Sequence, residues 1–487
     1  MTILESYIQD FLSATKEVIH LREIDRILII RPNKIQHLNE SAFEMLDALY
    51  NKKHPAGTVI GTLAKKYRVS AAQLENDLLA LLQSIRAIMN DDYSAPMIDT
   101  IDFDPDSISF PVLSEIALTY RCQNRCDFCY ASSPYRGQSV AEMSTSQVKI
   151  IIDKIFHEAH VPTVSFTGGE PTLRDDLPEL IRYAQSIGMR TNLITNGIRC
   201  ADKEYCAALA DAGLKSAQVS LESHRESIHN SIVGNRHAYR RTLQGVHSLK
   251  EAGIHTHTNT TICHKNRDTL IPFVEFIKKE FDPPYLSMNM IIKTGMAKIH
   301  DRDITYSSIG ALIKPVINFC ETVGITFVWY SPTPYCIFNP VDHNLGSKSC
   351  ACVSGLLSVN PAGDIIPCSS FDRGIGNLLK HSFEYIWNSD EALYWRERKY
   401  VPPVCRGCEY EILCGGACPL YWETAGSFEE IETVLKKKPK LKNAFWSLEK
   451  FLRVKTRGVM GFGSEADGIP SEESNAQINT SQEATDG

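Results

Sequence analysis

Apolar positions recur at helical spacing through residues 1–24, which predicts an amphipathic N-terminal helix. Residues 25–92 then open with an apolar run at 26–30, which predicts a strand, and continue with helical spacing that predicts three helices. Asn39 and Ser70 stand just before two of these helices, where their side chains can cap the first turn. A strand followed by three helices indicates a small winged-helix-like module.

From residue 113 to residue 330, short apolar runs alternate with longer amphipathic stretches. The runs that predict strands lie at residues 114–120, 163–167, 190–195, 216–221, 255–262, 285–292 and 326–330. Strands that alternate with helices pair in parallel, so this region predicts an α/β fold with an open parallel sheet or a barrel.

The remaining segments lack this alternation. The polar, proline-containing stretch 93–112 is typical of a linker. Short strands, glycines, prolines and cysteines dominate residues 331–432, as in a small domain that metal holds together rather than a large core. Residues 433–487 begin with a lysine-rich run that leads into a predicted helix, and their end is rich in Ser, Glu and Asn, which predicts disorder.

Composition narrows the class of protein. With 487 residues, 43% of them hydrophobic and 22% charged, most of the chain should fold into several globular domains. No apolar run is long enough for a membrane-spanning helix, and the N-terminus lacks the pattern of a signal peptide, so we expect a cytoplasmic protein. The net charge of −7 disfavours bulk affinity for nucleic acid.

Cysteines are distributed unevenly among these regions. Of the 15 cysteines, none falls in the first 121 residues, three lie within 122–129, and seven more lie between 350 and 418. Because a reducing compartment disfavours disulfides, such clusters indicate metal or redox sites.

Cys122, Cys126 and Cys129 lie on one loop directly after the first predicted strand of the α/β region. Thiolates at this C-x3-C-x2-C spacing can bind three irons of a 4Fe–4S cube and leave the fourth iron open. The alternative is part of a zinc site whose fourth ligand comes from elsewhere in the chain.

This loop, with Phe128 before its last cysteine, resembles the signature of the radical S-adenosylmethionine (radical SAM) superfamily. Further along, Ser165-Phe166-Thr167-Gly168-Gly169-Glu170-Pro171 resembles the glycine-rich motif of that family, and Val219-Ser220-Leu221-Glu222 ends a strand where relatives place a serine and an acid. The resemblance implies a partial (β/α)6 barrel over 113–330, with a 4Fe–4S cluster on the three cysteines. It also implies SAM contacts from Phe128, Gly168, Gly169, Glu170, Asn196 and Ser220. Simple turn capping is the alternative role for Asn196 and Ser220.

In that family, the reduced cluster cleaves SAM to methionine and a 5′-deoxyadenosyl radical, which removes a hydrogen atom from an unactivated C–H bond. The resemblance therefore implies an enzyme that takes electrons from a flavodoxin- or ferredoxin-type reductant. No general base or hydrogen donor is evident from the sequence.

The second cysteine set, together with Gly363, resembles the SPASM extension of radical SAM enzymes, which carries auxiliary 4Fe–4S clusters. Its members are Cys350, Cys352, Cys368, Cys405, Cys408, Cys414 and Cys418. Two cubes bound only by cysteine need about eight thiolates, and the last downstream cysteine of the family pattern is missing.

By analogy, one auxiliary cluster would use Cys352, Cys368 and Cys418, completed by Cys350. A second would use Cys405, Cys408 and Cys414, with a fourth ligand from a non-cysteine group, from substrate or from Cys336. A single auxiliary cluster stays open as an alternative, and so does a zinc ribbon.

Residues 25–92 resemble the PqqD-like fold, which recognises the leader of a ribosomally made precursor peptide by adding it as a strand to a sheet edge. DNA binding by a helix-turn-helix is the alternative, since the module carries a mildly basic face formed by Lys52, Lys53, Lys65, Lys66 and Arg68.

Together these regions predict a radical SAM/SPASM enzyme that modifies a precursor peptide by hydrogen abstraction, followed by crosslinking, epimerisation or oxidation. One alternative is the same core acting on a folded protein or a cofactor precursor, as in sulfatase-maturing or haem-pathway enzymes. The other is a non-catalytic iron–sulfur regulator that binds DNA. The sequence does not specify the substrate or the bond formed.

Overall fold

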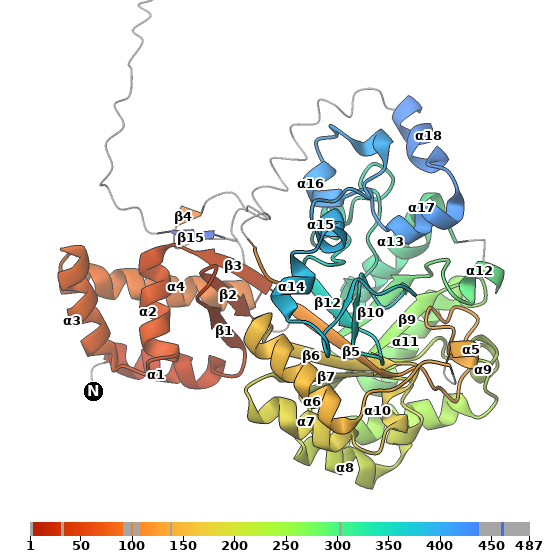
Figure 1. The fold of residues 1–487 in the computed structure, drawn as a ribbon, viewed down its shortest axis with the longest axis horizontal. Coiled ribbons are helices and arrows are strands. Elements are labelled where there is room, and N and C mark those ends of the chain that lie inside the picture. Colours follow the sequence, from red (N-terminus) through yellow and green to blue (C-terminus); the bar gives the residue numbers. More distant parts are fainter. Residues whose placement is uncertain are drawn as a thin grey trace, which may run out of the picture.

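The computed structural model describes residues 3–30, 34–90, 99–100, 108–136, 139–300, 304–437 and 459–461. A small N-terminal unit of helices and strands stands beside a larger unit that is built around a ten-stranded sheet (Figure 1). Within the described ranges, no helix is long and apolar enough to cross a bilayer.

The N-terminal unit packs helices on one small sheet. Its elements are α1 (Ile3–Thr15), β1 (Ile19–Arg22), β2 (Ile27–Ile30), β3 (Lys34–Leu38), α2 (Glu40–Tyr50), α3 (Ala56–Tyr67) and α4 (Ala71–Met89). The prediction of one helix over 1–24 was wrong beyond Thr15, because residues 19–22 pair with β2 in antiparallel register, Ile19 opposite Ile30. The alternation of buried Ile19 and Leu21 suits a strand, and the partner strand decides the outcome.

The predicted caps of this unit are present. The Asn39 side chain accepts the Ala42 N–H at 2.9 Å and begins α2, and Ser70 accepts the Gln73 N–H at 3.1 Å and begins α4. The apolar face of α4 packs into the core of this unit, where Leu74, Leu78, Leu82 and Ile85 are all buried.

The edge of this sheet at β3 pairs with another strand. β15 (Val459–Gly461) runs parallel to β3, with Val459 opposite His37, and β4 (Asp99–Thr100) pairs with β15 on its far side. Apart from these strands, the predicted linker lies mostly outside the described residues. The predicted tail does so as well beyond α18 (Glu429–Lys437).

The larger unit contains all the strands predicted between residues 113 and 330, with bounds within two residues of the expected ones. They are β5 (Leu113–Thr119), β6 (Thr163–Gly168), β7 (Arg190–Thr195), β8 (Ser216–Ser220), β9 (His255–Ile262), β10 (Tyr285–Met290) and β11 (Thr326–Trp329). Neighbours pair in parallel in chain order, and β5 pairs with β12 rather than with β11. The predicted α/β fold with a partial barrel is therefore confirmed.

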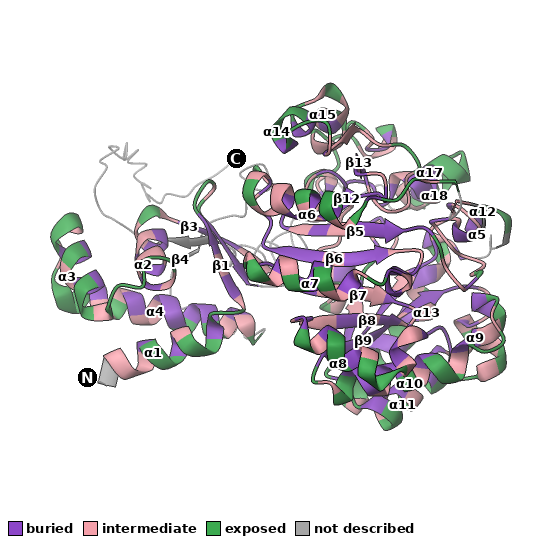
Figure 2. Cartoon of the chain, turned by 60° about the horizontal axis from the view of Figure 1, so that its bottom comes forward, coloured by how far each residue is buried: buried purple, intermediate pink, exposed green. Residues whose placement is uncertain are grey.

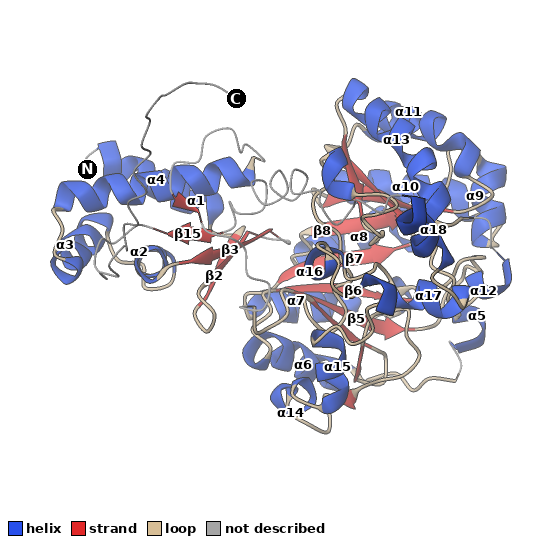
Figure 3. Cartoon of the chain, turned by 90° about the horizontal axis from the view of Figure 1, so that it is seen from above, coloured by secondary structure: helices blue, strands red, loops and turns tan. Residues whose placement is uncertain are grey.

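Helices cover the outer face of this sheet (Figure 3). The main ones are α6 (Thr145–Asp153), α7 (Leu177–Ser186), α8 (Lys203–Asp211), α10 (Ala238–Glu251), α11 (Leu270–Phe281) and α13 (Tyr306–Val323). The strands of the sheet are largely buried (Figure 2). Val164 and Leu193, which face the helices, are fully buried.

The inner face of the barrel is more polar. In β7, half-buried Asn192 and Ile194 alternate with buried neighbours, so these two side chains face the interior. Asn192 donates to Ser165 at 3.1 Å, and Asn259 donates to Asn289 at 2.8 Å. The interior is therefore lined partly with amide and hydroxyl groups, beside apolar side chains such as Ile194.

The C-terminal domain continues the barrel sheet and then becomes a set of short helices. Its elements are β12 (Leu356–Val359), β13 (Asp364–Ile366), β14 (Gly376–Asn377), α14 (Phe383–Trp387), α15 (Asp390–Arg396), α16 (Glu411–Cys414) and α17 (Pro419–Ala425). β12 runs parallel to β5, with Leu356 opposite Leu113, so the domain is joined to the first barrel strand by backbone pairing.

Arg22 fixes the N-terminal unit against the barrel. Its buried guanidinium binds Asp25 at 2.8 Å and donates to the Pro111 and Phe110 carbonyls at 2.6 and 3.1 Å, just before β5 begins. Because a charged group donates to each carbonyl, these bonds are stronger than neutral ones and hold the two units together.

Candidate active site and cysteine groups

The cysteine loop begins directly after β5, at the carboxyl end of the parallel sheet. Helix α9 (Glu226–Val233) supports it from outside, because the Val233 and Ile232 carbonyls accept the Arg125 and Asp127 N–H groups at 2.9 and 3.0 Å. These carbonyls belong to the last turn of α9 and have no partner within that helix. The support places Cys122, Cys126 and Cys129 around one cavity.

The three thiols are placed where metal would compensate their charge. Burial raises the pKa of Cys122 to about 12. Burial, followed by the charges of Cys129 and Cys122, raises the pKa of Cys126 well above its usual range. Thiolates so close together repel one another unless positive charge lies between them, and the irons of a cluster supply that charge. The site therefore fits the predicted three-cysteine 4Fe–4S cluster.

Gly168 and Gly169 let the end of β6 lie against the start of the cysteine loop. A side chain on Gly168, whose φ is +128°, would place Cβ 2.1 Å from the Thr119 carbonyl oxygen. On Gly169 the Cβ would be 2.5 Å from the Arg121 carbonyl oxygen. Both are backbone contacts that cannot yield, so only glycine fits at either position. Both residues line the cavity, as predicted for SAM contacts.

Glu170 lies behind the cavity rather than in its wall. It is fully buried, and its carboxylate accepts hydrogen bonds from Thr172 Oγ1 at 2.6 Å, Thr195 Oγ1 at 2.7 Å and the Asn196 N–H at 2.8 Å. Burial raises the pKa of Glu170, and these donors act against that rise. The contacts make Glu170 a residue that ties the end of β6 to the end of β7, while direct contact with SAM stays a prediction.

The other predicted SAM contacts, Phe128, Asn196 and Ser220, all line the cavity. Asn196 serves two purposes there. Its Oδ1 accepts the Ile198 N–H at 3.0 Å, which is the turn-capping role, and its Nδ2 lies 3.8 Å from Cys122 Sγ.

The structure also brings residues to the cavity that sequence reasoning did not assign to the site, including Tyr130 and Thr195. Tyr130 follows the last cysteine, and its hydroxyl donates to the Gly168 carbonyl at 3.4 Å. Its signal in the sequence was adjacency to the cysteine loop. Glu222, the acid noted beside Ser220, lines the same cavity, accepts the Thr261 N–H at 2.9 Å and has its pKa raised to about 8 by burial.

In the C-terminal domain, Cys350, Cys352, Cys368 and Cys418 form one group. The Cys350 and Cys352 sulfurs lie 3.3 Å apart. Burial, followed by the charges of Cys350 and Cys418, raises the pKa of Cys368, and burial with the charge of Cys350 raises that of Cys418 to about 12. These four thiols fit the predicted ligand set of one auxiliary cluster.

Cys405, Cys408 and Cys414 lie apart from that group, around α16. Burial, followed by the charge of Cys414, raises the pKa of Cys405 to about 12, and Cys408 adds to the effect. These three thiols fit part of a second cluster.

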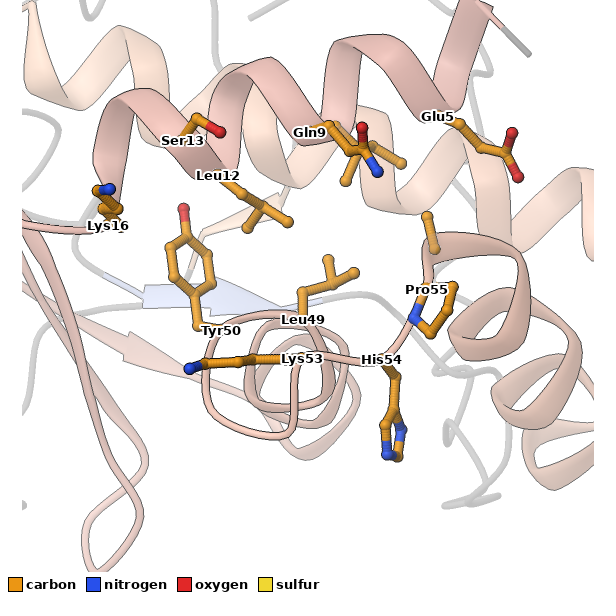
Figure 4. A pocket seen from close by; sticks show the side chains of 12 residues that line it. Glu5, Gln9, Leu12, Ser13, Lys16, Leu49, Tyr50, Lys53, His54 and Pro55 are labelled. Atoms are coloured by element: carbon orange, nitrogen blue, oxygen red, sulfur yellow. The ribbon is translucent and has the colours of Figure 1, made fainter. Parts of the chain in front are cut away.

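A further open groove lies in the N-terminal unit, between α1 and the connection from α2 to α3 (Figure 4). Its volume is about 710 Å³, and apolar Leu12 and Leu49 face each other across it, with Lys16 and Lys53 at its rim. At its base, Tyr50 Oη lies 2.5 Å from Thr15 Oγ1, and burial raises the pKa of Tyr50 to about 12. The groove owes one wall to α1, which precedes the winged-helix region.

Three family descriptions match consecutive parts of the chain. Residues 116–277 match the radical SAM superfamily, residues 350–409 match SPASM, an iron–sulfur cluster-binding domain, and residues 26–88 match coenzyme PQQ synthesis protein D, PqqD. The matches fall within the barrel, the C-terminal domain and the N-terminal unit, and the SPASM match ends before Cys414 and Cys418.

Two curated relatives align with the chain over most of their own length. The chain is 26% identical over 348 residues to an AdoMet-dependent heme synthase of Oleidesulfovibrio alaskensis, which covers 67% of this chain and 87% of the relative. It is also 26% identical over 322 residues to a PqqA peptide cyclase of Bradyrhizobium diazoefficiens, which covers 64% of this chain and 82% of the relative.

Solved structures share the fold. Streptococcus suis SuiB bound to its precursor peptide SuiA aligns with a TM-score of 0.61 and 17% identity over 83% of this chain and 92% of SuiB. Native anSMEcpe with bound AdoMet aligns with a TM-score of 0.52 and 14% identity, over 68% of this chain and 100% of that one.

The chain therefore contains a radical SAM domain, a SPASM domain and an N-terminal PqqD domain, and it is an enzyme that catalyses radical chemistry. Its cofactors are SAM and 4Fe–4S clusters. The predictions of enzyme class, domain types and cofactors are confirmed, whereas the individual ligand and contact residues stay predictions that the geometry supports.

Proposed function

We propose that this enzyme modifies a ribosomally made precursor peptide, whose leader binds the N-terminal unit while its core enters the barrel. The observation that carries the proposal is the N-terminal sheet. Its β3 edge already accepts the short parallel strand β15, so it can pair with an added strand, and a leader would take the place of β15. Arg22 holds this sheet against the start of β5, which keeps a bound leader tethered to the barrel that contains the reaction site.

Each part of the site has a role in this proposal. When bound, the cluster and SAM supply a 5′-deoxyadenosyl radical. Cys122, Cys126 and Cys129 would bind the cluster, and the exposed backbone at Gly168 and Gly169 allows SAM to approach closely. The amide and hydroxyl groups of the barrel interior, such as Asn192, would orient the peptide so that one C–H bond faces the radical carbon.

The electron source is part of the proposal. A flavodoxin- or ferredoxin-type protein would reduce the radical SAM cluster, and the auxiliary clusters would carry the electron that the substrate loses. A cytoplasmic location agrees with fifteen cysteines that are all free thiols, since a reducing compartment keeps them available for iron.

A second candidate is the same chemistry on a cofactor precursor, because the heme synthase relative is as similar to this chain as the peptide cyclase. The match of residues 26–88 to PqqD favours the peptide, since a small cofactor precursor offers no strand for the β3 edge.

The test is a pair of substitutions at His37, which lies on the β3 edge. Leu38 N–H donates to the Arg26 carbonyl at 3.0 Å, so by alternation the His37 N–H points away from β2, toward the edge. His37→Pro removes this donor, and His37→Ala removes the same side chain but keeps it.

The experiment supplies anaerobic, reduced enzyme with SAM and with precursor peptides encoded beside its gene. Mass spectrometry follows peptide modification, and fluorescence anisotropy follows leader binding. We expect leader affinity to fall at least about tenfold in His37→Pro relative to His37→Ala, the equivalent of about 1.4 kcal/mol. Equal affinity in the two variants would contradict leader binding at this edge. An enzyme that converts a porphyrin precursor and no peptide would support the second candidate.

A further inference from the structure

The two cysteine groups of the C-terminal domain differ in the number of thiols that they supply. Cys350, Cys352, Cys368 and Cys418 supply four thiols, as a cube bound only by cysteine requires. The group around α16 has three within the SPASM segment, and residues 419–487 contain no cysteine. A fourth thiol for this group must come from elsewhere, or one iron of its cluster stays open.

The segment after β11 lies directly against this incomplete group. The Tyr335 N–H donates to Cys414 Sγ at 3.4 Å, and Cys414 Sγ lies 3.8 Å from the Thr333 carbonyl oxygen. The Tyr335 ring packs against the Tyr410 ring, with centroids 5.9 Å apart. Residues at both ends of α16 therefore contact the segment that carries Cys336.

The local turn holds Cys336 in place. The Pro334 carbonyl accepts the Ile337 and Phe338 N–H groups, both at 2.9 Å, and Thr333 Oγ1 donates to the Phe338 carbonyl at 3.0 Å. These bonds close a tight turn around residue 336, so its backbone is ordered before any metal binds.

The Cys336 thiol is electrostatically coupled to the same three cysteines. Burial, followed by the charges of Cys414 and Cys408, raises its pKa to about 12, and the Cys336 charge in turn acts on Cys405. Burial raises the pKa of all four thiols, so they are costly to ionise without metal, and iron would offset that cost.

The remaining cysteines do not compete with Cys336 for the place of the fourth ligand. Cys200, Cys206, Cys263 and Cys320 are buried in the apolar core of the barrel unit, and the Cys206 thiol donates to the Cys200 carbonyl at 3.1 Å. Within the described part of the chain, no three His, Cys, Asp or Glu residues converge on a point where a single ion could bind. A cube does not require such convergence, because each of its thiolates binds a different iron atom.

We propose that Cys336 joins Cys405, Cys408 and Cys414 as the fourth ligand of a second auxiliary 4Fe–4S cluster. Cys336, which lies upstream, takes the place of the missing downstream cysteine. Both auxiliary clusters then have four cysteine ligands each, and no iron stays open for substrate. They transfer electrons and do not bind a substrate thiolate. The inference rests on the SPASM cofactors and is independent of the peptide substrate.

The test is an iron count on the full-length enzyme, reconstituted without oxygen. Three complete clusters give about 12 irons per chain, and Cys336→Ala should lose about four of them or yield the EPR signal of a three-iron cluster. Cys320→Ala is the matched control, a cysteine removed from the barrel core, and should keep all the iron. Cys336→Ser, which retains a weaker oxygen ligand, should keep the cluster with a shifted reduction potential.

Double variants show which cluster is affected. If Cys336 and Cys408 bind the same cube, Cys336→Ala/Cys408→Ala loses no more iron than either single variant, whereas Cys336→Ala/Cys352→Ala loses about twice as much. Wild-type iron content and spectra in Cys336→Ala would overturn the proposal, as would a wild-type enzyme with only about eight irons. Neither result depends on whether a peptide is modified, so failure here is distinct from failure of the proposed function.

Discussion

The barrel and the C-terminal domain both gather cysteines, but over very different lengths of chain. The barrel site takes its thiols from residues 122–129, on one loop that α9 and β6 hold in place. The α16 group takes its thiols from two segments, near residue 336 and at 405–414. A short loop presents three ligands and leaves a corner for a cofactor, whereas a site assembled by the whole fold can close all four corners. Whether a cluster keeps one iron open thus depends on how its cysteine ligands are distributed along the chain.

The largest effect should follow from breaking the open site. Cys126→Ala leaves two thiols for the cube, so the SAM-binding cluster is lost and 5′-deoxyadenosine production should fall to background. The measurement is anaerobic turnover of SAM with dithionite, followed by liquid chromatography. A variant that still makes 5′-deoxyadenosine at a substantial rate would show that Cys126 is not a ligand.

The next largest effect tests whether SAM cleavage requires the close backbone packing at Gly168. Gly168→Ala places a methyl group 2.1 Å from a backbone oxygen and should lower the rate of SAM cleavage by at least about a hundredfold, or about 2.7 kcal/mol. Gly188→Ala is the matched control, because its φ is also positive, at +97°, but its nearest neighbour is 3.6 Å away. The control should cost about 1 kcal/mol of stability and keep the rate. Equal rate losses would assign the effect to backbone strain alone.

Iron removal should separate the two regions by their source of stability. The cysteines of the second set lie on loops and short helices, whereas β6 to β9 lie in a continuous apolar core, to which α17 also adds Leu420, Tyr421 and Trp422. Under a chelator, amide hydrogen exchange should accelerate at least about tenfold in residues 350–418 and stay slow in the barrel strands. Unchanged protection in 350–418 would show that this domain folds without its clusters.

The smallest effect concerns the pH dependence of stability that comes from His257, a buried histidine in the barrel strand β9. Burial, followed by the charge of His255, lowers the pKa of His257 to about 3, and its Nδ1 lies 3.1 Å from the Tyr285 hydroxyl. Below pH 6.5 the unfolded chain binds a proton that the folded chain excludes, so stability falls as the pH falls from 6.5 toward 3.

The slope from this group is at most about 1.4 kcal/mol per pH unit, and His257→Gln should remove it. Thermal unfolding followed at pH 7.0 and pH 5.5 measures the difference. If the variant destabilises as steeply as the wild type over this interval, His257 is not the group responsible.

The sequence predicted best those features that depend on neighbouring residues. The barrel strands are separated by amphipathic helices, so their bounds follow from local periodicity, and the loop of Cys122, Cys126 and Cys129 follows from spacing alone. The end of the N-terminal helix failed because residues 19–22 suit either structure and only pairing with β2 selects the strand. The role of Glu170 was also hidden, since its partners Thr195 and Asn196 come from another strand.

Long-range assembly accounts for what else was missed. Nothing local indicates that β12 pairs with β5, more than two hundred positions earlier, or that the turn at Cys336 packs against α16. Such contacts depend on where the barrel places its ends, which periodicity does not report.

The position of Arg22 sets a length requirement on the substrate. Arg22 holds the N-terminal unit at the start of β5, and the cysteine loop begins at the end of that strand, so the two sites lie toward opposite ends of the barrel (Figure 2). A seven-residue strand spans about 23 Å, and an extended peptide needs about seven residues to cover that distance. If the leader binds the β3 edge as proposed, the barrel would select substrate positions by their distance: a side chain fewer than about seven residues from the leader would not reach the radical.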